Sequence, residues 1–353
     1  MAKPAGKKAT LTDVAQASGV SLATVSRVLA HSNYPVSEAA KKRVLQAVAE
    51  LDYVPNMAAR ALKKNTGSDI GIILPNISNP FYMQTLQGIS TLAMESGHQL
   101  ILCNSMRRAE DEHALLYSLY ERRVLGIILS SVDEKADTVN SYAARGMPLV
   151  LLDQRLQGAN CSMIHYDTRK GTMLAMRHLI ERGHRRIALA TLPITRWTRH
   201  ETVAGYRDAL VEAGIGAEDS LILVHDQEQE MDNGNTDLQA GAALAARFIR
   251  EAAGATAVLC VNDILAFGVI QGLTAAGLCV PRDVSVVGFD DILLAAAYQP
   301  ALTTVRYPSF EMGRFAVMML LDALRSAEGR EPLHLQLEPQ LIARDTVASP
   351  KGI

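Results

Sequence analysis

The chain is poor in cysteine and in aromatic residues, with four cysteines among 353 residues and 5% aromatic side chains. Cys103, Cys161, Cys260 and Cys279 form no Cys-x-x-Cys pair, and three of them lie in apolar runs, as is typical of reduced thiols in a cytoplasmic protein. No apolar run is long enough to span a membrane, and no apolar stretch follows the basic residues near Met1 to form a signal peptide. We therefore expect a cytoplasmic protein without a membrane partner.

The sequence also lacks the common motifs of catalysis. It contains no P-loop or dinucleotide-type glycine-rich loop and no Gly-x-Ser-x-Gly elbow, and its nine histidines show no His-Glu-x-x-His spacing. His178 and His184 read as residues at a helix end rather than as metal ligands. We expect no enzymatic activity, no cofactor and no metal.

Charge is distributed unevenly along the chain. Residues 1–66 hold ten Lys or Arg against four Asp or Glu, whereas the rest of the chain holds 25 against 33. This asymmetry is typical of a phosphate-binding module joined to a different kind of domain. Residues 1–9 are expected to form a flexible basic tail, whose Lys3, Lys7 and Lys8 either attract DNA or are simply solvated.

Residues 10–55 show the pattern of a helix-turn-helix followed by a third helix. Thr12 is expected to cap the first helix, and Gly19 permits the tight turn that follows. Ser21 is expected to cap the second helix and Ser37 the third. The residues expected to pack inward are Val25, Val28 and Leu29 of the second helix and Val44, Leu45, Val48 and Leu51 of the third.

The remaining polar and small side chains of this head suit contact with DNA. The second helix leaves Leu22, Ala23, Thr24, Ser26 and Arg27 near its N-terminal and outer surface. A recognition helix meets the major groove with this part of its surface. The third helix exposes Lys41, Lys42 and Arg43, which suit phosphate contacts. A similar three-helix bundle also occurs in proteins that never touch DNA, but the basic charge favours DNA binding.

Four segments together identify a family. Residues 13–29, 36–62, 261–268 and 283–291 resemble the lactose/galactose repressor family of bacterial transcription regulators, and the resemblance extends from about Ala9 to about Arg344. It implies that Leu22 and Ala23 face base edges, where apolar side chains can contact a thymine methyl. The DNA-contacting set it implies is Thr12, Ser21, Leu22, Ala23, Thr24, Ser26, Arg27, Asn56, Ala59 and Leu62.

The last three of these residues fall in residues 56–67, which the resemblance implies to be a hinge helix and linker. In the family the hinge helix orders on DNA, pairs with its dimer mate and inserts a leucine into the minor groove, here Leu62. The alternative is that Leu62 is an ordinary apolar linker residue. A wedge of this kind unstacks a base step at a cost of a few kcal/mol, offset by wider contact with the kinked duplex.

Beyond residue 68, apolar strand-like runs alternate with helix-like segments. The expected strands are residues 69–75, 99–105, 126–131, 148–153, 186–192, 221–226, 257–263 and 284–290, with helices between them, including residues 81–95 and 203–213. This alternation predicts parallel sheets covered on both faces. The predicted fold is a small all-α helix-turn-helix head plus an α/β, periplasmic-binding-protein-like core of two doubly wound parallel-sheet subdomains. Residues 226–237 read as an exposed loop.

The carboxyl ends of these strands carry the candidate ligand residues, since parallel sheets bind ligands at this edge. The resemblance implies a small effector in a cleft between the halves, with Asp153, Asn262 and Asp290 as polar contacts. The full candidate set is Asn79, Phe81, Asp153, Arg155, Tyr166, Arg196, Trp197, Arg199, Thr202, Asn262 and Asp290. Asp263 and Asp291 read as structural residues, and Tyr166 either lines the cleft or braces the crossing between halves.

One departure from the family pattern bears on the ligand. Relatives usually carry an arginine three residues before the Gly205-Tyr206 pair, where this chain has Thr202. Arg196, Trp197 and Arg199 supply nearby cationic and aromatic groups. Because a guanidinium binds carboxylate or phosphate well, we hypothesise an acidic sugar derivative such as an aldonate or sugar phosphate. The alternative is that these arginines are solvated loop charges.

The core is expected to span residues 68–353, with an N-subdomain of about 68–166 plus 306–336 and a C-subdomain of about 167–305 plus 337–347. Amphipathic segments near 83–93, 117–123 and 310–324 favour a homodimer, as does recognition of a palindromic operator. The chain ends without the heptads of a tetramerising coiled coil.

The predicted function is repression of carbohydrate or sugar-acid catabolic genes under control of a small inducer. The alternatives are a purine- or metabolite-responsive, corepressed regulator, and a small-molecule-binding protein without a DNA function.

Overall fold

A computed structural model describes residues 9–29, 35–53, 69–216, 221–226, 236–325 and 331–351. The chain divides into two compact units, 1–67 and 68–353. Asn56, Ala59 and Leu62 of the predicted hinge, and the lysines of the tail, lie outside the described residues.

The first unit contains three helices, α1 (Leu11–Ser18), α2 (Leu22–Leu29) and α3 (Glu38–Glu50). They pack around a small apolar core that includes Val14, Val25, Val28 and Val44. Gly19 adopts a left-handed conformation, with φ of 62°, and its N–H binds Ala15 O to end α1. The sequence therefore predicted the helix-turn-helix and its turn correctly.

Two of the three predicted helix caps are confirmed. Ser21 Oγ accepts a hydrogen bond from Thr24 N at 3.1 Å, and Ser37 Oγ accepts one from Ala40 N at 3.4 Å. The prediction that Thr12 caps α1 was wrong, because Thr12 lies exposed inside the helix.

The cap of α1 is Thr10, which forms a capping box with Asp13. Leu45 also differs from its prediction: it is 48% exposed, and Ala47 takes the buried position at 3%. The pattern of α3 allowed either spacing, and Ala47 belongs to the apolar core of the head together with Val14 of α1.

The second unit contains two sheets, each of six strands in the described part of the chain. The N-subdomain sheet has the strand order β11-β5-β4-β3-β1-β2, and all its pairs are parallel. Its strands are β1 (Asp69–Leu74), β2 (Gln99–Asn104), β3 (Gly126–Leu129), β4 (Leu149–Leu152), β5 (Ser162–Tyr166) and β11 (His334–Leu337). Its helices are α5 (Phe81–Glu95), α6 (Ala109–Glu121), α7 (Asp137–Ala144) and α13 (Ser309–Arg325).

The C-subdomain sheet has the order β12-β10-β9-β8-β6-β7, in which only β12 is antiparallel to its neighbour. Its strands are β6 (Ile187–Thr191), β7 (Ile222–Val224), β8 (Ala257–Cys260), β9 (Ser285–Asp290), β10 (Thr303–Arg306) and β12 (Gln340–Ile342). Its helices are α8 (Thr168–Glu181), α9 (Trp197–Glu212), α10 (Thr236–Glu251), α11 (Asp263–Ala275) and α12 (Leu293–Ala297).

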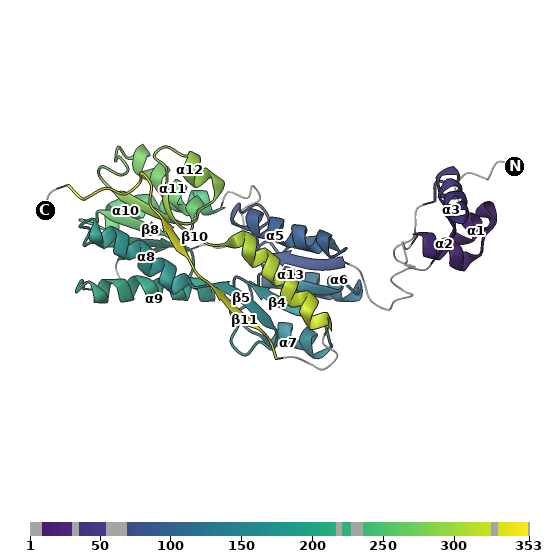
Figure 1. The fold of residues 1–353 in the computed structure, drawn as a ribbon. Coiled ribbons are helices and arrows are strands. Elements are labelled where there is room, and N and C mark those ends of the chain that lie inside the picture. The colour runs from purple at the N-terminus through teal and green to yellow at the C-terminus, as the bar shows by residue number, and fades with distance from the viewer. Residues whose placement is uncertain are drawn as a thin grey trace. The chain divides into compact units, whose positions relative to one another are not determined.

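Helices cover both faces of each sheet (Figure 1). The inner strands β3, β4 and β8 are buried along their whole length. Strands buried on both faces read as continuous apolar runs, and this is why they were predictable. The predicted fold of a helical head plus a two-subdomain α/β core with parallel sheets is confirmed.

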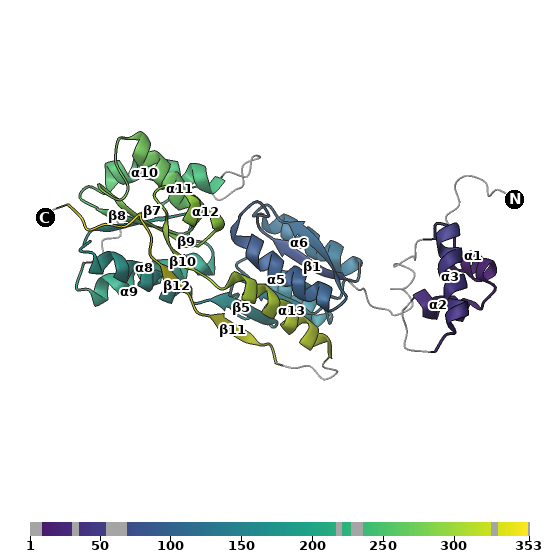
Figure 2. The same ribbon diagram turned by 45° about the horizontal axis from the view of Figure 1, so that its top comes forward.

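The chain crosses between the two subdomains three times, after β5, after β10 and after β11. Figure 2 shows the last crossing, in which the yellow segment runs from β11 in one sheet to β12 in the other. Arg306 pairs with Asp290 in the C-subdomain sheet and Leu337 pairs with Tyr166 in the N-subdomain sheet. Arg306, which was expected in the N-subdomain, therefore lies in the C-subdomain, and Leu337, which was expected in the C-subdomain, lies in the N-subdomain.

Candidate functional site

One pocket of the core is lined by residues from both subdomains. It encloses about 660 Å³ of empty space, part of it open to solvent. Eight of the predicted ligand residues line it: Asn79, Phe81, Asp153, Arg196, Arg199, Thr202, Asn262 and Asp290.

Three predicted residues are absent from this lining. Arg155 is exposed on the surface. Tyr166 is fully buried behind the pocket and stacks on Tyr307, so it braces the crossing between subdomains. Trp197 makes an edge contact with the His165 ring at 4.9 Å. The lining residues that sequence reasoning missed are Tyr82, Arg107, Thr168, Thr198, Val261, Phe289 and Tyr307.

Strand ends bring the pocket carboxylates together, as the parallel topology predicts. Asp153 directly follows β4, and Asp290 is the last residue of β9. Both have positive φ, 62° and 109°. Such backbone geometry is uncommon outside glycine, and it turns each side chain out of the regular strand pattern.

The electrostatic setting of these carboxyls favours their neutral form. Although part of each side chain faces the pocket, burial raises the pKa of Asp153 to about 7, against an opposing effect of Arg196. Burial and the nearby carboxylates of Asp263, Asp153 and Asp237 raise the pKa of Asp290 well above its ordinary value. A ligand that donates hydroxyl hydrogen bonds would stabilise the charged form of both groups.

Two arginines of the pocket belong to the start of α9. This helix begins at Trp197 rather than at Val203 as predicted, so Arg199 is helical, and the interpretation of it as a solvated loop charge was wrong. Arg199 is 8% exposed, and its Nη1 donates to Pro193 O at 2.7 Å. Arg196 is half-buried, and its Nη2 donates to Ser131 O at 3.3 Å. Among the described residues, the buried Nε of Arg196 has no hydrogen-bond partner.

A buried ion pair crosses between the subdomains beside the pocket. Arg107 follows β2 in the N-subdomain, and its two terminal nitrogens donate to the carboxylate of Asp237 at 2.9 and 3.1 Å. Asp237 belongs to α10 of the C-subdomain, so its assignment to an exposed loop was wrong. The two side chains are 6% and 7% exposed.

Asp237 has a second polar partner in the pocket. Asn262 Nδ2 donates to Asp237 at 2.9 Å, while Asn262 Oδ1 caps α11 by accepting from Leu265 N at 2.7 Å. Burial acts to raise the pKa of Asp237, but Arg107, Asn262 and Arg199 together hold it below its ordinary value. Asp237 is therefore a permanent negative charge next to the pocket.

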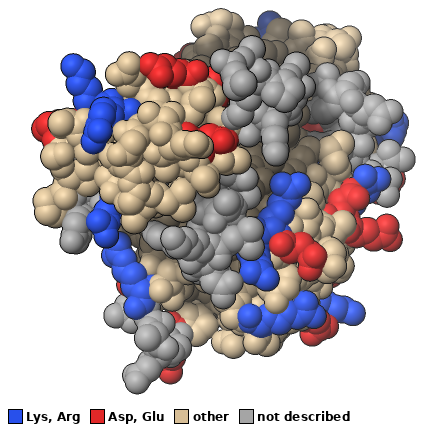
Figure 3. Space-filling model, turned by 90° about the vertical axis from the view of Figure 1, so that its right-hand side faces the viewer, with Lys and Arg blue, Asp and Glu red and all other residues tan. Residues whose placement is uncertain are grey.

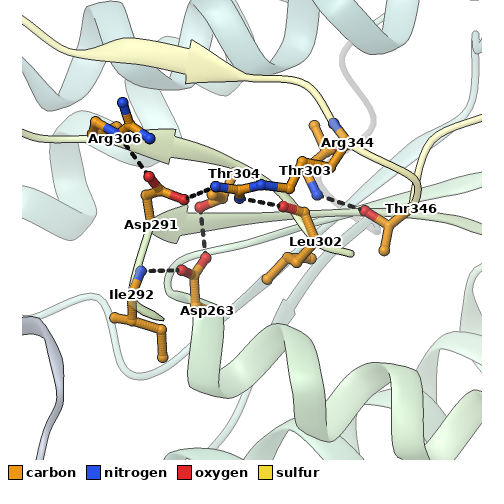
Figure 4. Close-up of polar contacts among 9 residues, drawn as sticks. All are labelled: Asp263, Asp291, Ile292, Leu302, Thr303, Thr304, Arg306, Arg344 and Thr346. Carbon is orange, nitrogen blue, oxygen red and sulfur yellow. Dashed lines mark hydrogen bonds and ion pairs between the residues drawn. The ribbon is translucent and has the colours of Figure 1, made fainter. Parts of the chain in front are cut away.

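Asp263 and Asp291 each hold a group of polar contacts between neighbouring segments of the C-subdomain (Figure 4). Asp263 is fully buried and accepts hydrogen bonds from Ile292 N at 2.9 Å and from Thr304 Oγ1 at 2.6 Å. It joins α11 to β10 and to the turn after β9. The structural role expected for Asp263 is confirmed, although α11 is capped by Asn262 instead.

Asp291 is held on both sides by arginines. Arg306 Nε donates to one of its oxygens at 2.6 Å, and Arg344 Nη2 donates to the other at 2.5 Å. Asp291 has a positive φ of 51°, next to the positive φ of Asp290. Figure 4 shows both arginines on Asp291. Their two ionic contacts fix the turn that follows Asp290, a residue of the pocket lining.

The predicted DNA-contacting side chains of α2 lie mainly on its exposed surface. Leu22 is 48% exposed, and Ala23, Ser26 and Arg27 are also exposed, while Thr24 is half-buried. Lys41, Lys42 and Arg43 of α3 are exposed as well. On the face drawn in Figure 3, Lys and Arg project at several separate places with Asp and Glu between them. Contact of these residues with DNA stays a prediction.

Two further properties concern the described residues as a group. They contain no cluster of three or more His, Cys, Asp or Glu that could hold a metal ion. None of their helices combines the length and apolar character that crossing a membrane requires.

Models of two families match the chain. The model of bacterial regulatory proteins of the lacI family matches residues 10–56, and that of the periplasmic binding protein-like domain matches residues 176–347. The HTH-type transcriptional repressor PurR of Photobacterium profundum is 31% identical over 340 residues, which cover 96% of this chain and 98% of the relative.

Solved structures show the same architecture. A lac repressor dimer bound to operator and the anti-inducer ONPF has a TM-score of 0.83 and 27% identity, over 97% of this chain and all of that chain. A complex of the transcriptional regulator CelR with cellobiose has a TM-score of 0.70 and 30% identity, over 96% and 99%. These similar proteins are all transcriptional regulators.

Proposed function

This chain belongs to the lacI family of bacterial regulatory proteins, and on that premise we propose how a small molecule controls it. It is a DNA-binding transcriptional repressor. A polyhydroxylated ligand, a sugar or sugar acid, binds in the core pocket and changes the affinity of a homodimer for palindromic operator DNA. The genes controlled are those for catabolism of that ligand.

The observation that carries this proposal is the placement of Asp153 and Asp290 in one pocket, at the strand ends of two different sheets. A carboxylate accepts hydrogen bonds from two vicinal hydroxyls, and this pair offers acceptors from two directions. Phe81 and Phe289 line the same pocket and offer apolar surface to a sugar ring. A sugar satisfies both kinds of group, and the similar regulator CelR is described as a complex with a sugar, cellobiose.

Control follows from linkage between two binding events. Because the pocket has walls from both subdomains, a bound ligand stabilises one arrangement of the subdomains over others. If that arrangement has a different operator affinity, ligand and operator affect each other's affinity by the same factor. We propose induction, in which the ligand weakens operator binding and so releases genes for its own breakdown.

An acidic sugar is the second candidate ligand. The buried Nε of Arg196, which lacks a hydrogen-bond partner among the described residues, supports it. A ligand oxygen could accept from this nitrogen, and a carboxylate would do so most strongly.

The homodimer is proposed from exposed apolar side chains on helices of the N-subdomain. Met83 and Met94 of α5 are 64% and 72% exposed, and Met318 of α13 is 51% exposed. Helices α5 and α13 pack against each other, so these side chains belong to neighbouring elements. Light scattering of the purified chain tests this: a monomer at micromolar concentration would contradict the proposal.

A thermal-shift screen of the full chain tests the ligand class. Neutral sugars, aldonates, sugar phosphates and purines are compared, each with Asp153→Asn as the matched variant. A ligand at about a hundred times its dissociation constant adds roughly 2.7 kcal/mol, enough to raise Tm by several degrees. A shift with sugars that the variant loses supports the proposal, whereas a shift with purines alone would replace it by a corepressed, purine-responsive regulator.

The active compound is then tested on DNA. Fluorescence anisotropy measures binding to the DNA upstream of the chain's own gene and to random duplex, at several salt concentrations. Induction predicts that the compound lowers affinity for the upstream DNA more than for the random duplex. A compound that raises this affinity would reverse the proposed sign of control.

A further inference from the structure

We infer that Asp237 is a specificity-determining residue of the pocket, because its carboxylate occupies the place at which Arg107 and Asn262 would otherwise hold an acidic group of the ligand. The pocket therefore selects uncharged polyhydroxy compounds over their carboxylated counterparts. This inference rests on the proposed function of the pocket as the ligand site, and it chooses between the two ligand classes left open there.

The contact between Arg107 and Asp237 has the geometry with which an arginine binds a ligand carboxylate. Two nitrogens of one guanidinium donate to the two oxygens of one carboxylate, at 2.9 and 3.1 Å. Such a bidentate pair combines charge with a planar fit, and it is the form in which arginine recognises acids most strongly. Arg107 lines the pocket, but this part of its binding capacity is already used by the protein itself.

Asn262 and Arg199 also interact with the carboxylate of Asp237. Asn262 donates one amide hydrogen to Asp237, and its amide oxygen accepts a hydrogen bond from Leu265 N. Arg199 attracts Asp237 electrostatically, and its Nη1 donates to Pro193 O. Three polar side chains of the pocket lining thus have Asp237 as a common partner. Donors and positive charges that converge in this way bind an anion, and here the anion is the side chain of Asp237 in α10.

The groups that remain for the ligand are rich in acceptors. Asp153 and Asp290 line the pocket, and the charge of Arg196 is opposed by Asp153. A ligand carboxylate would add a negative charge beside these two acids, whereas ligand hydroxyls would donate to them. The acidic-sugar hypothesis relied on Arg196 and Arg199 as cationic groups, and Arg199 is instead engaged by the protein.

The substitution Asp237→Asn tests the inference because it keeps the size of the side chain and removes its charge. Arg107 then loses its carboxylate partner while still lining the pocket. We expect Asp237→Asn to bind the carboxylated member of a sugar pair at least tenfold more tightly than the wild-type chain does. The pairs are glucose with gluconate, ribose with ribonate and cellobiose with cellobionate, measured by thermal shift and then by calorimetry on the full chain.

The matched control is Asp208→Asn, which removes a carboxylate from an ion pair with Arg169 on the surface of the same subdomain. It should keep the wild-type preference. The double variant Asp237→Asn with Arg107→Gln should lose the gain for acids, since the released guanidinium is gone. If Asp237→Asn fails to fold, Arg107→Gln alone decides: it removes the guanidinium that pairs with Asp237 and leaves Asn262 and Arg199 beside this anion, so it should discriminate against acids more strongly than the wild type.

The outcomes separate the two proposals. Preference of the wild-type chain for the acidic member, or an unchanged preference in Asp237→Asn, would overturn the inference and leave the pocket as a ligand site. No stabilisation of any variant by any compound of the panel would overturn the proposed function, and the inference with it.

Discussion

Tyr166 and Tyr307 stack face to face, with ring centroids 4.0 Å apart and an angle of 13° between the ring planes. Tyr166 ends β5 just before the first crossing between subdomains, and Tyr307 lies in the second crossing. Tyr166 Oη also donates to Ser309 Oγ at 3.0 Å, at the start of α13. The two tyrosines therefore tie together two chain segments on which the relation between the subdomains depends.

Replacing Tyr166 by leucine should lower the free energy of unfolding of the core by about 2–4 kcal/mol, since a large buried ring is lost and a cavity remains. Tyr166→Phe keeps the ring and loses only the hydroxyl bond, so its cost should be about 1 kcal/mol. Urea unfolding followed by circular dichroism measures both. Equal losses for the two variants would show that the stacking contributes little.

Gly88→Ala should destabilise the core by about 1–3 kcal/mol or more, because overpacking at a helix contact forces the backbone to shift. A Cβ at Gly88 in α5 would overlap the carbonyl oxygen of Phe310 and lie 3.2 Å from Arg314 N. Gly216→Ala is the matched control, since a Cβ there would meet nothing within 4 Å. A Tm of Gly88→Ala within a degree of that control would contradict the close packing of α5 on α13.

Because burial raises the pKa of Asp153, the contribution of this carboxyl to the stability of the fold falls as pH rises. The folded state keeps the proton up to about pH 7, while the unfolded chain releases it near 3.8, so between these values this group destabilises the fold as pH rises. Asp153→Asn, which tolerates the positive φ, should therefore be more stable than the wild type at pH 8, by up to about 4 kcal/mol, and about equal to it at pH 3.5. Unfolding of both proteins across this range measures the difference, and a difference independent of pH would contradict the assignment.

Arg27→Ala should weaken operator binding and reduce the slope of log affinity against log salt concentration by about one for each head bound, if Arg27 contacts a phosphate. Arg250→Ala removes an exposed arginine from α10 of the core and serves as the control. Fluorescence anisotropy at 50–200 mM salt, roughly the range in which such slopes are read, measures both. An unchanged slope with lost sequence preference would show that Arg27 contacts a base instead.

The features that the sequence predicted correctly depend on local patterns. The caps by Ser21 and Ser37 follow from single residues before apolar helices, and the buried strands of the core follow from continuous apolar runs. The pocket residues Asp153 and Asp290 were predictable because parallel strands end at a common edge, and the family pattern pointed to the same positions.

The features that were missed depend on contacts between distant segments. Arg107 and Asp237 are 130 residues apart, and neither stands next to a motif that marks the pocket. From its polar neighbours, Asp237 reads as the end of an exposed loop rather than as a buried residue of a helix. Strands β5, β10, β11 and β12 were also missed. The half-exposed residues of β11 and β12 lack the apolar run of an inner strand, and polar residues interrupt the apolar ones of β5 and β10.

The three crossings have a consequence for how the protein is made. Strands β11 and β12 are the outermost strands of different sheets, and both come from the final stretch of the chain. During synthesis, β5 and β10 therefore keep open edges until residue 342 has left the ribosome, whereas the head is complete some 290 residues earlier, counted from the end of α3 at Glu50. Open edges favour pairing with other chains, so a product cut short before residue 334 would carry the head on an aggregation-prone body. The helix-turn-helix head is thus translated before the core that regulates it.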